Sequence, residues 1–260
     1  MNTKKQFFWL FYTLLLISLF IGCKNVKNEK AEKSEQTKTE ESQALDNKEL
    51  KDEMYMNSLI ENLTGIEYFY VKYRTVYNDK EHLYNSLLSL LKYKNDANYN
   101  KLQQYHNTQH KVKLMDTKSG YLVVEGTESI NYYTYWNLTD GSGNKLMALV
   151  SRDCGPACTD AIWFYRIVKD NTNGTAYKFE KTNTNDIIKR FNELPEILLG
   201  HEIDDYYPIS YNLPQKGKNI SMCNPDDINL IIEDDDSLER NGKCIELIWD
   251  GNEGTFTPEI

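Results

Sequence analysis

The feature that most constrains the fold of this chain is a series of short β-branched and aromatic runs that begins near Lys111 and continues almost to the C-terminus. Segments rich in Gly, Asn, Asp and Ser separate these runs. Runs of this length with such turns between them are typical of antiparallel strands joined by hairpins. The expected strands are 112–114, 121–125, 131–137, 145–151, 162–168, 176–180, 219–223, 228–233 and 244–250. No longer internal repeat accompanies them, which excludes propellers and solenoids.

A helical pattern precedes the strands. Leucine and tyrosine recur at helical spacing within 49–63 and 79–94, and Asn78 or Asp79 can cap the second of these segments. Gly65 is expected to end the first segment. A helix is favoured over a strand within 66–77, where the pattern alternates poorly, and a further short helix is expected within 96–107.

One further helix is expected among the strands, from Asn185 to Leu194, with Asn185 as its cap and Pro195 after its end. The sequence therefore predicts an α+β fold, in which an N-terminal helical segment packs on an antiparallel β-sheet domain with one interrupting helix. This folded part is expected to be a single domain over 49–260, mainly helical to residue 110 and mainly β from residue 111.

The N-terminus has a short basic region followed by an apolar run over 7–20. This run is at the short end of what spans a bilayer, and it ends in a small residue beside a cysteine. The segment Leu19-Phe20-Ile21-Gly22-Cys23 resembles the lipobox of bacterial lipoproteins, with Phe20 where leucine is usual. The resemblance covers the leader alone. It implies that residues 1–22 are a signal peptide and that Cys23 is acylated, by palmitate among other chains, and so anchors the chain to a membrane.

The resemblance also implies a location in the bacterial cell envelope. Lys24 follows the cysteine, where some lipoproteins carry an aspartate that retains them in the inner membrane, so the outer membrane or the cell surface is favoured. An uncleaved anchor with an incidental cysteine is the alternative. Residues 23–48 are polar and charged with almost no apolar side chain, and we expect them to be a disordered tether.

Four more cysteines follow Cys23, and in an exported chain they are expected to form disulfides. Cys154 and Cys158 flank a tight Gly-Pro-Ala loop between two expected strands. Cys223 ends one expected strand and Cys244 begins another. We therefore favour the pairs 154–158 and 223–244 over the other two connectivities. The spacing differs from the two-residue knuckles of zinc ribbons and of thiol-disulfide oxidoreductases.

The segment 152–160 is the part of the chain most like a binding loop. Arg152, Asp153 and Asp160 bring charge to the expected disulfide hairpin, and Trp163 lies in the aromatic strand that follows. A pre-organised loop loses little entropy on binding, so these four residues are a candidate binding site. A stapled hairpin with no ligand is the plainer alternative.

Metal ligands are not indicated. His106 and His110 stand four residues apart, but no third ligand is identifiable, and exposed polar histidines are the favoured interpretation. The acidic run 233–236 lacks the alternating oxygens and central glycine of a calcium loop. We therefore expect no metal and no cofactor.

A formal net charge of −9 without a basic cluster argues against nucleic acid as a partner. No nucleophile, zinc-peptidase or nucleotide-binding motif is present in a supporting context, so catalysis is disfavoured. The expected function is a membrane-anchored, exported lipoprotein that binds another envelope protein or glycan. The alternatives are an exported inhibitor or protective protein that uses the Cys154–Cys158 loop, and a glycan-directed hydrolase whose carboxylates would come from Glu125, Glu128, Asp153 and Asp160.

Overall fold

The computed structural model describes residues 51, 53–103, 108–154, 158–169, 177–199, 209–224 and 244–260. By its contacts the chain divides into two units, Met1–Tyr55 and Met56–Ile260, and the second contains the fold described below. The expected signal peptide, the tether and the expected strand at 228–233 lie outside the described residues. Within the described part of the chain, no helix combines the length and the apolar character needed to cross a bilayer.

The helical segment follows the sequence pattern closely. Its elements are a helix over 53–61, α3 (Gly65–Lys72), the 3-10 helix η1 (Tyr73–Tyr77), α4 (Lys80–Tyr93) and α5 (Ala97–Leu102). Asp79 caps α4 by accepting a hydrogen bond of 3.0 Å from the backbone N–H of His82, as predicted. Gly65 differs from the prediction, because it begins α3 with a φ of +54° and does not close the preceding helix.

Six strands form one antiparallel sheet in which each strand pairs with the next in the chain. The strands are β1 (Lys111–Asp116), β2 (Tyr121–Glu125), β3 (Ser129–Asn137), β4 (Lys145–Cys154), β5 (Cys158–Lys169) and β6 (Tyr177–Thr182). The central strand β4 is buried on both faces. Leu146, Ala148 and Val150 belong to a core shared with a second sheet, while Met147 and Leu149, also buried, point to the opposite face.

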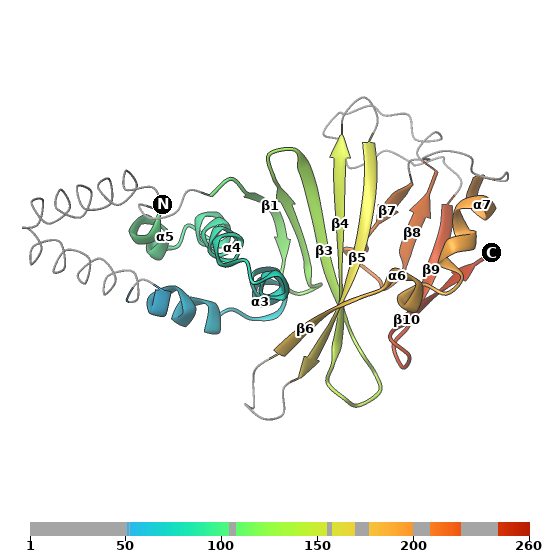
Figure 1. Cartoon of the computed structure of the whole chain (residues 1–260), viewed down its shortest axis with the longest axis horizontal. Coiled ribbons are helices and arrows are strands. Elements are labelled where there is room, and N and C mark those ends of the chain that lie inside the picture. Colours follow the sequence, from blue (N-terminus) through green and yellow to red (C-terminus); the bar gives the residue numbers. More distant parts are fainter. Residues whose placement is uncertain are drawn as a thin grey trace, which may run out of the picture. The chain divides into compact units, whose positions relative to one another are not determined.

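The helices cover this opposite face (Figure 1). The ring of Phe69 in α3 meets that of Tyr135 edge-on at a centroid distance of 4.9 Å, and Tyr70 meets Tyr133 at 5.1 Å. These aromatic contacts fix the helical segment on the sheet. The predicted packing of an N-terminal helical segment on an antiparallel sheet is therefore confirmed.

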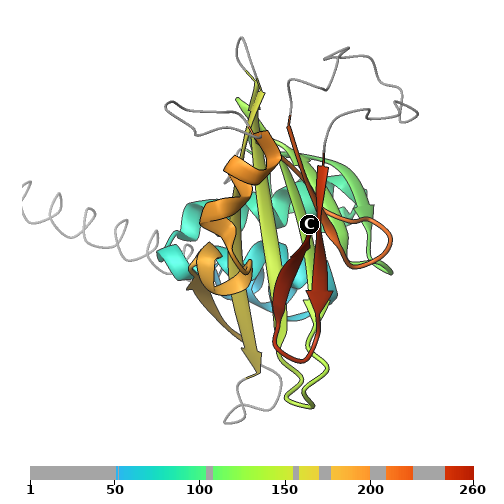
Figure 2. The same cartoon turned by 90° about the vertical axis from the view of Figure 1, so that its right-hand side faces the viewer.

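The second sheet has four antiparallel strands in the order β10-β9-β8-β7. Its strands are β7 (Ser210–Asn212), β8 (Ile220–Cys223), β9 (Cys244–Asp250) and β10 (Thr255–Glu259). Trp136 of the first sheet packs against Phe256 at 5.0 Å and Trp249 at 5.6 Å, and its indole N–H donates to the carbonyl of Lys218 at 2.8 Å. Figure 2 views the molecule from the side of this sheet.

The interrupting helical segment is present but divided into three short pieces, α6 (Thr184–Ile187), η2 (Phe191–Glu193) and α7 (Leu194–Leu199). The cap is Asn183 and not Asn185, because the Asn183 side chain accepts from the backbone N–H of Asn185 at 3.0 Å. Arg190 then takes a left-handed conformation with a φ of +57°. Pro195 lies in the first turn of α7, where a backbone N–H has no helical partner in any case.

Candidate functional site

Two disulfides connect neighbouring strands at directly opposite positions. Cys154 at the end of β4 bonds to Cys158 at the start of β5, with an S–S distance of 2.03 Å. Cys223 of β8 bonds to Cys244 of β9 at 2.07 Å. Both favoured pairings are therefore present. They indicate that the chain folds in a non-reducing environment.

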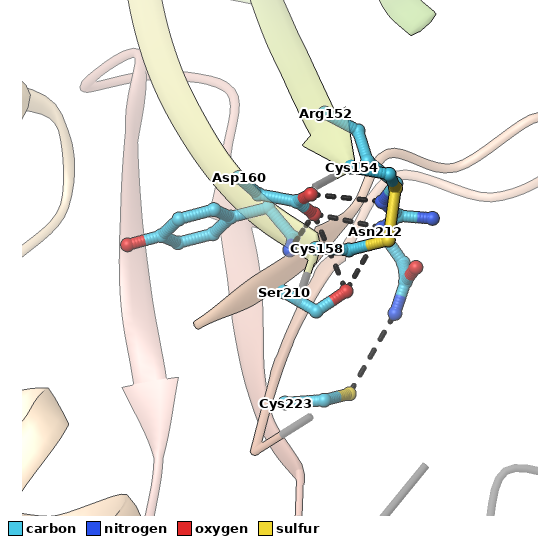
Figure 3. A network of polar contacts seen from close by, with 8 residues as sticks. Arg152, Cys154, Cys158, Asp160, Ser210, Asn212 and Cys223 are labelled. Atoms are coloured by element: carbon cyan, nitrogen blue, oxygen red, sulfur yellow. Dashed lines mark hydrogen bonds and ion pairs between the residues drawn. A yellow bond between two sulfur atoms is a disulfide. The ribbon is translucent and has the colours of Figure 1, made fainter. Parts of the chain in front are cut away.

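Next to the first disulfide, Arg152 and Asp160 form a bidentate ion pair between β4 and β5 (Figure 3). Arg152 Nε donates to Asp160 Oδ1 at 2.8 Å, and Arg152 Nη2 donates to Asp160 Oδ2 at 2.7 Å. The Asp160 side chain is only 2% exposed, and that of Arg152 is 20% exposed. Paired donors of this kind match the two oxygens of a carboxylate, which makes the ion pair directional as well as electrostatic.

The same ion pair reaches across to β7 of the second sheet. Arg152 Nη2 also donates to Ser210 Oγ at 2.9 Å, and the Ser210 hydroxyl in turn donates to Asp160 Oδ2 at 3.3 Å. The backbone N–H of Tyr211 donates to the same carboxylate oxygen at 2.9 Å. Four donors thus satisfy a nearly buried carboxylate, and the network connects the two sheets.

The electrostatics of the network favour a fixed charge state. Hydrogen bonds to Asp160 raise the pKa of the Arg152 guanidinium, against the opposing effect of burial. The ring of Tyr132, 5.4 Å from the guanidinium carbon, adds a cation–π contact. Burial, and then the nearby Asp160 carboxylate, raise the pKa of the Tyr211 hydroxyl. The network is therefore a charged pair beside a neutral phenol.

The second disulfide lies close to this network. Ser210 stands opposite Cys223 in the pairing of β7 with β8, and Asn212 Nδ2 contacts Cys223 Sγ at 3.6 Å. Arg152, two residues before Cys154, is therefore connected through Ser210 to the strand that carries the other disulfide. We call these neighbouring strand ends, with their two disulfides and the Arg152–Asp160–Ser210 network, the stapled end.

The four residues of the predicted binding site are not gathered into one cluster. Arg152 and Asp160 form an ion pair with each other, whereas Asp153 is exposed to solvent. Trp163 is half-buried in β5, four residues beyond the strand partner of Asp153 and hence about 13 Å along the strand. Within the described residues, Asp153 is thus the only one of the four whose charge faces solvent. Binding by these residues stays a prediction.

The hydrolase alternative loses one of its carboxylates in this geometry. Asp160 is occupied by four internal hydrogen bonds, and Glu125 meets Lys113 on the sheet surface at 3.4 Å. In the described ranges no three His, Cys, Asp or Glu side chains converge as a metal site would need. The acidic run 233–236 and His106 lie outside those ranges.

Ser210 and Tyr211 were not predicted as site residues, because a three-residue strand gives no alternating pattern in the sequence. His110 was expected at the surface, whereas its side chain is half-buried and its Nδ1 atom is enclosed. Comparisons with protein-family models, with curated proteins and with solved structures find no match to this chain. The residues and their geometry therefore carry the functional argument alone.

Proposed function

We propose that this protein is an exported, lipid-anchored component of the bacterial cell envelope that binds another envelope protein or a glycan without catalysis. The lipobox-like segment ending at Cys23 supports the anchor, and the two disulfides agree with export. The polar segment 23–48 then serves as the tether between the lipid and the folded unit.

The observation that carries the binding role is the construction of the stapled end. Two disulfides, and an ion pair whose carboxylate accepts four hydrogen bonds, hold the ends of strands from both sheets in one place. A surface fixed in this way loses little conformational entropy when a partner binds, so more of the contact energy appears as affinity. Asp153 and Cys154 are exposed at this end and are the residues that a partner reaches first.

The anchor is tested by metabolic labelling with an alkyne fatty acid in a bacterial host. We expect the wild-type chain to take up the label and to fractionate with membranes, and Cys23→Ala to lose both properties. Cys154→Ser/Cys158→Ser is the matched control, because it also removes cysteines but leaves the lipobox. Equal labelling of the Cys23→Ala chain would exclude lipidation at this residue.

The binding role is tested by chemical crosslinking in intact envelopes, followed by capture of the full chain and mass spectrometry. We expect a dominant partner with the wild-type chain, and a weaker yield of the same partner with Asp153→Lys. Lys178→Glu, a charge reversal on the exposed face of β6, is the control and should leave the yield unchanged. Equal capture by all three chains would exclude the stapled end as the contact surface.

The stapled hairpin favours a second candidate, an exported inhibitor or protective protein whose Cys154–Cys158 loop enters the cleft of a target. The two candidates differ in the captured partner. An enzyme whose activity falls when the purified chain is added would support the inhibitor. A structural protein or a glycan would support the envelope-binding role.

A further inference from the structure

A second polar cluster lies on the other face of the six-stranded sheet, beneath the helices. Its centre is Arg74 in η1, whose guanidinium carbon lies 4.7 Å from the centre of the Tyr73 ring. Arg74 forms no ion pair with any residue that the structure describes. Arg152 at the stapled end, by contrast, has its charge matched by Asp160.

The side chains around Arg74 are mainly phenols. Four buried tyrosines face it from α3, η1, β3 and β5, namely Tyr70, Tyr73, Tyr133 and Tyr165. The hydroxyls of Tyr73 and Tyr133 are 3.4 Å apart, and burial raises the pKa of all four phenols. These groups are therefore neutral near pH 7: their oxygens can accept hydrogen bonds from the guanidinium, as that of Tyr133 does, but they offer it no negative charge.

Two histidines complete the cluster. The rings of His110 and His82 are 6.2 Å apart, and burial, followed by the charges of Arg74 and His82, lowers the pKa of His110. The nearby carboxylate of Asp79 is already used, because it contacts His82 Nδ1 at 2.5 Å and caps α4. The Asp79 carboxylate therefore interacts with His82 and with the N-terminus of α4, and it forms no ion pair with Arg74 among the described residues.

Two buried polar atoms in this region, Arg74 Nε and His110 Nδ1, make no hydrogen bond to any described residue. The Ser86 hydroxyl interacts with that of Tyr70, where burial raises the pKa of the phenol and hydrogen bonds to Ser89 and Ser86 partly oppose this. Buried polar atoms are paired in the large majority of cases, and an uncompensated buried cation is costly. Both Arg74 Nε and His110 Nδ1 can donate a hydrogen bond, and donors around a cation are complementary to a negatively charged ligand.

We propose that this cluster is a binding site for a small anion, either a carboxylate or an inorganic oxyanion, held by the Arg74 guanidinium with His110 and the surrounding hydroxyls as further donors. The ligand must be small because the aromatic rings of the helices and of the sheet are packed around the guanidinium. Tyr77 and the His82 side chain, each 48% exposed, are the solvent-exposed groups next to the cluster, since Tyr77 meets Tyr165 and His82 meets His110. This site is independent of the function proposed for the stapled end.

Binding at this site is linked to the protonation of His110. The titratable groups that face His110 and Arg74 are His82, Asp79, Tyr70, Tyr73, Tyr77, Tyr133 and Tyr165. A bound anion adds the negative charge that these groups lack. It should therefore increase the affinity of His110 for its proton roughly tenfold, the effect of an opposite charge at close range.

The test uses the full chain in detergent micelles with ¹³C-labelled histidine, titrated with sodium formate or sodium sulfate against sodium chloride at constant ionic strength. We expect formate or sulfate, and not chloride, to raise the His110 pKa in a saturable manner and to raise the Tm. Formate and sulfate distinguish the carboxylate from the oxyanion. His110→Gln assigns the NMR signal, and the signal of His82, whose ring centre is 6.2 Å away, should respond to the same salts with a smaller shift.

Arg74→Met should abolish both responses, whereas Lys178→Met, which removes an exposed cation on β6, should retain them. If Arg74→Met does not fold, Arg74→Lys replaces it and should weaken the response at least tenfold, because a single ammonium cannot reproduce the guanidinium geometry. A wild-type His110 signal that moves equally in all three salts would overturn the proposal, as would an unchanged response in Arg74→Lys.

Discussion

Removal of the Arg152–Asp160 ion pair should destabilise the fold well beyond the cost of a surface charge. The Asp160 side chain is 2% exposed and accepts from Arg152, Ser210 and the backbone of Tyr211. Replacing one member of a buried pair typically costs about 3–5 kcal/mol, since the other charge stays buried without compensation. Arg152 is 20% exposed, so water can partly solvate it, and we expect about 3 kcal/mol for Asp160→Leu. Arg152→Met should cost about 4 kcal/mol, because the carboxylate that it leaves is more enclosed.

The double variant Arg152→Met/Asp160→Leu separates the charge effect from the packing effect. Two apolar side chains leave no unpaired charge, so the loss should be smaller than the sum of the single losses by about 2 kcal/mol or more. Urea unfolding under oxidising conditions measures it, with tryptophan fluorescence as the signal because Trp136 and Trp249 lie between the two sheets. Lys178→Met, in the exposed Lys178–Glu180 pair, should be indistinguishable from wild type. Single losses below about 1 kcal/mol, or a double variant equal to their sum, would refute the assignment of Arg152 and Asp160 as a buried pair in which each charge compensates the other.

Three further predictions concern other parts of the fold. The pKa of His110 is lowered in the folded chain, so as the pH falls the unfolded chain takes up the His110 proton before the folded chain does. The urea midpoint should therefore fall as the pH drops below about 6.5. His110→Gln should give a flatter pH profile. Replacing both cysteines of the β8–β9 disulfide by serine should lower the free energy of unfolding by about 3 kcal/mol, because this disulfide joins residues 21 apart in the sequence. The same replacement at the β4–β5 disulfide, with a separation of 4, should cost about 2 kcal/mol. The reverse order in urea unfolding would contradict the chain-entropy reasoning. Gly120→Ala should lower the Tm, because Gly120 has a φ of +73° and a Cβ there would lie 2.5 Å from the ring of Tyr135; an unchanged Tm would show that the ring can move away at no cost.

The elements that the sequence predicted correctly are those with a long, regular pattern. The expected strands 121–125 and 244–250 coincide with β2 and β9, and the cap at Asp79 begins α4 as expected. The two strands that were not expected lack such a pattern. β7 has three residues, and β10 contains Pro258, which an edge strand tolerates because the proline there needs no hydrogen-bonded N–H.

Part of the network at the stapled end could be predicted from the sequence. Once Cys154 and Cys158 are paired as direct partners on antiparallel strands, the residues two positions away on each side must also be opposite each other, and these are Arg152 and Asp160. An arginine and an aspartate at opposite positions of a sheet are expected to interact. The contribution of Ser210 was not predictable, because it depends on how a strand fifty residues later packs across the first sheet.

The comparison of Arg152 with Arg74 explains why the two arginines are assigned different roles. Both are half-buried, both lie against a tyrosine ring, and each is next to strands of the six-stranded sheet. Arg152 has a carboxylate with matching geometry, so its hydrogen-bonding capacity is used within the chain and its effect is on stability. Arg74 has phenols and a neutral imidazole around it, so its positive charge is balanced by no described group. A buried charge balanced within the chain holds elements together, whereas one without a balancing group is matched most directly by a ligand from outside. For this reason Arg152 is assigned a structural role within the stapled end, and the anion site is placed at an arginine that no sequence motif marks.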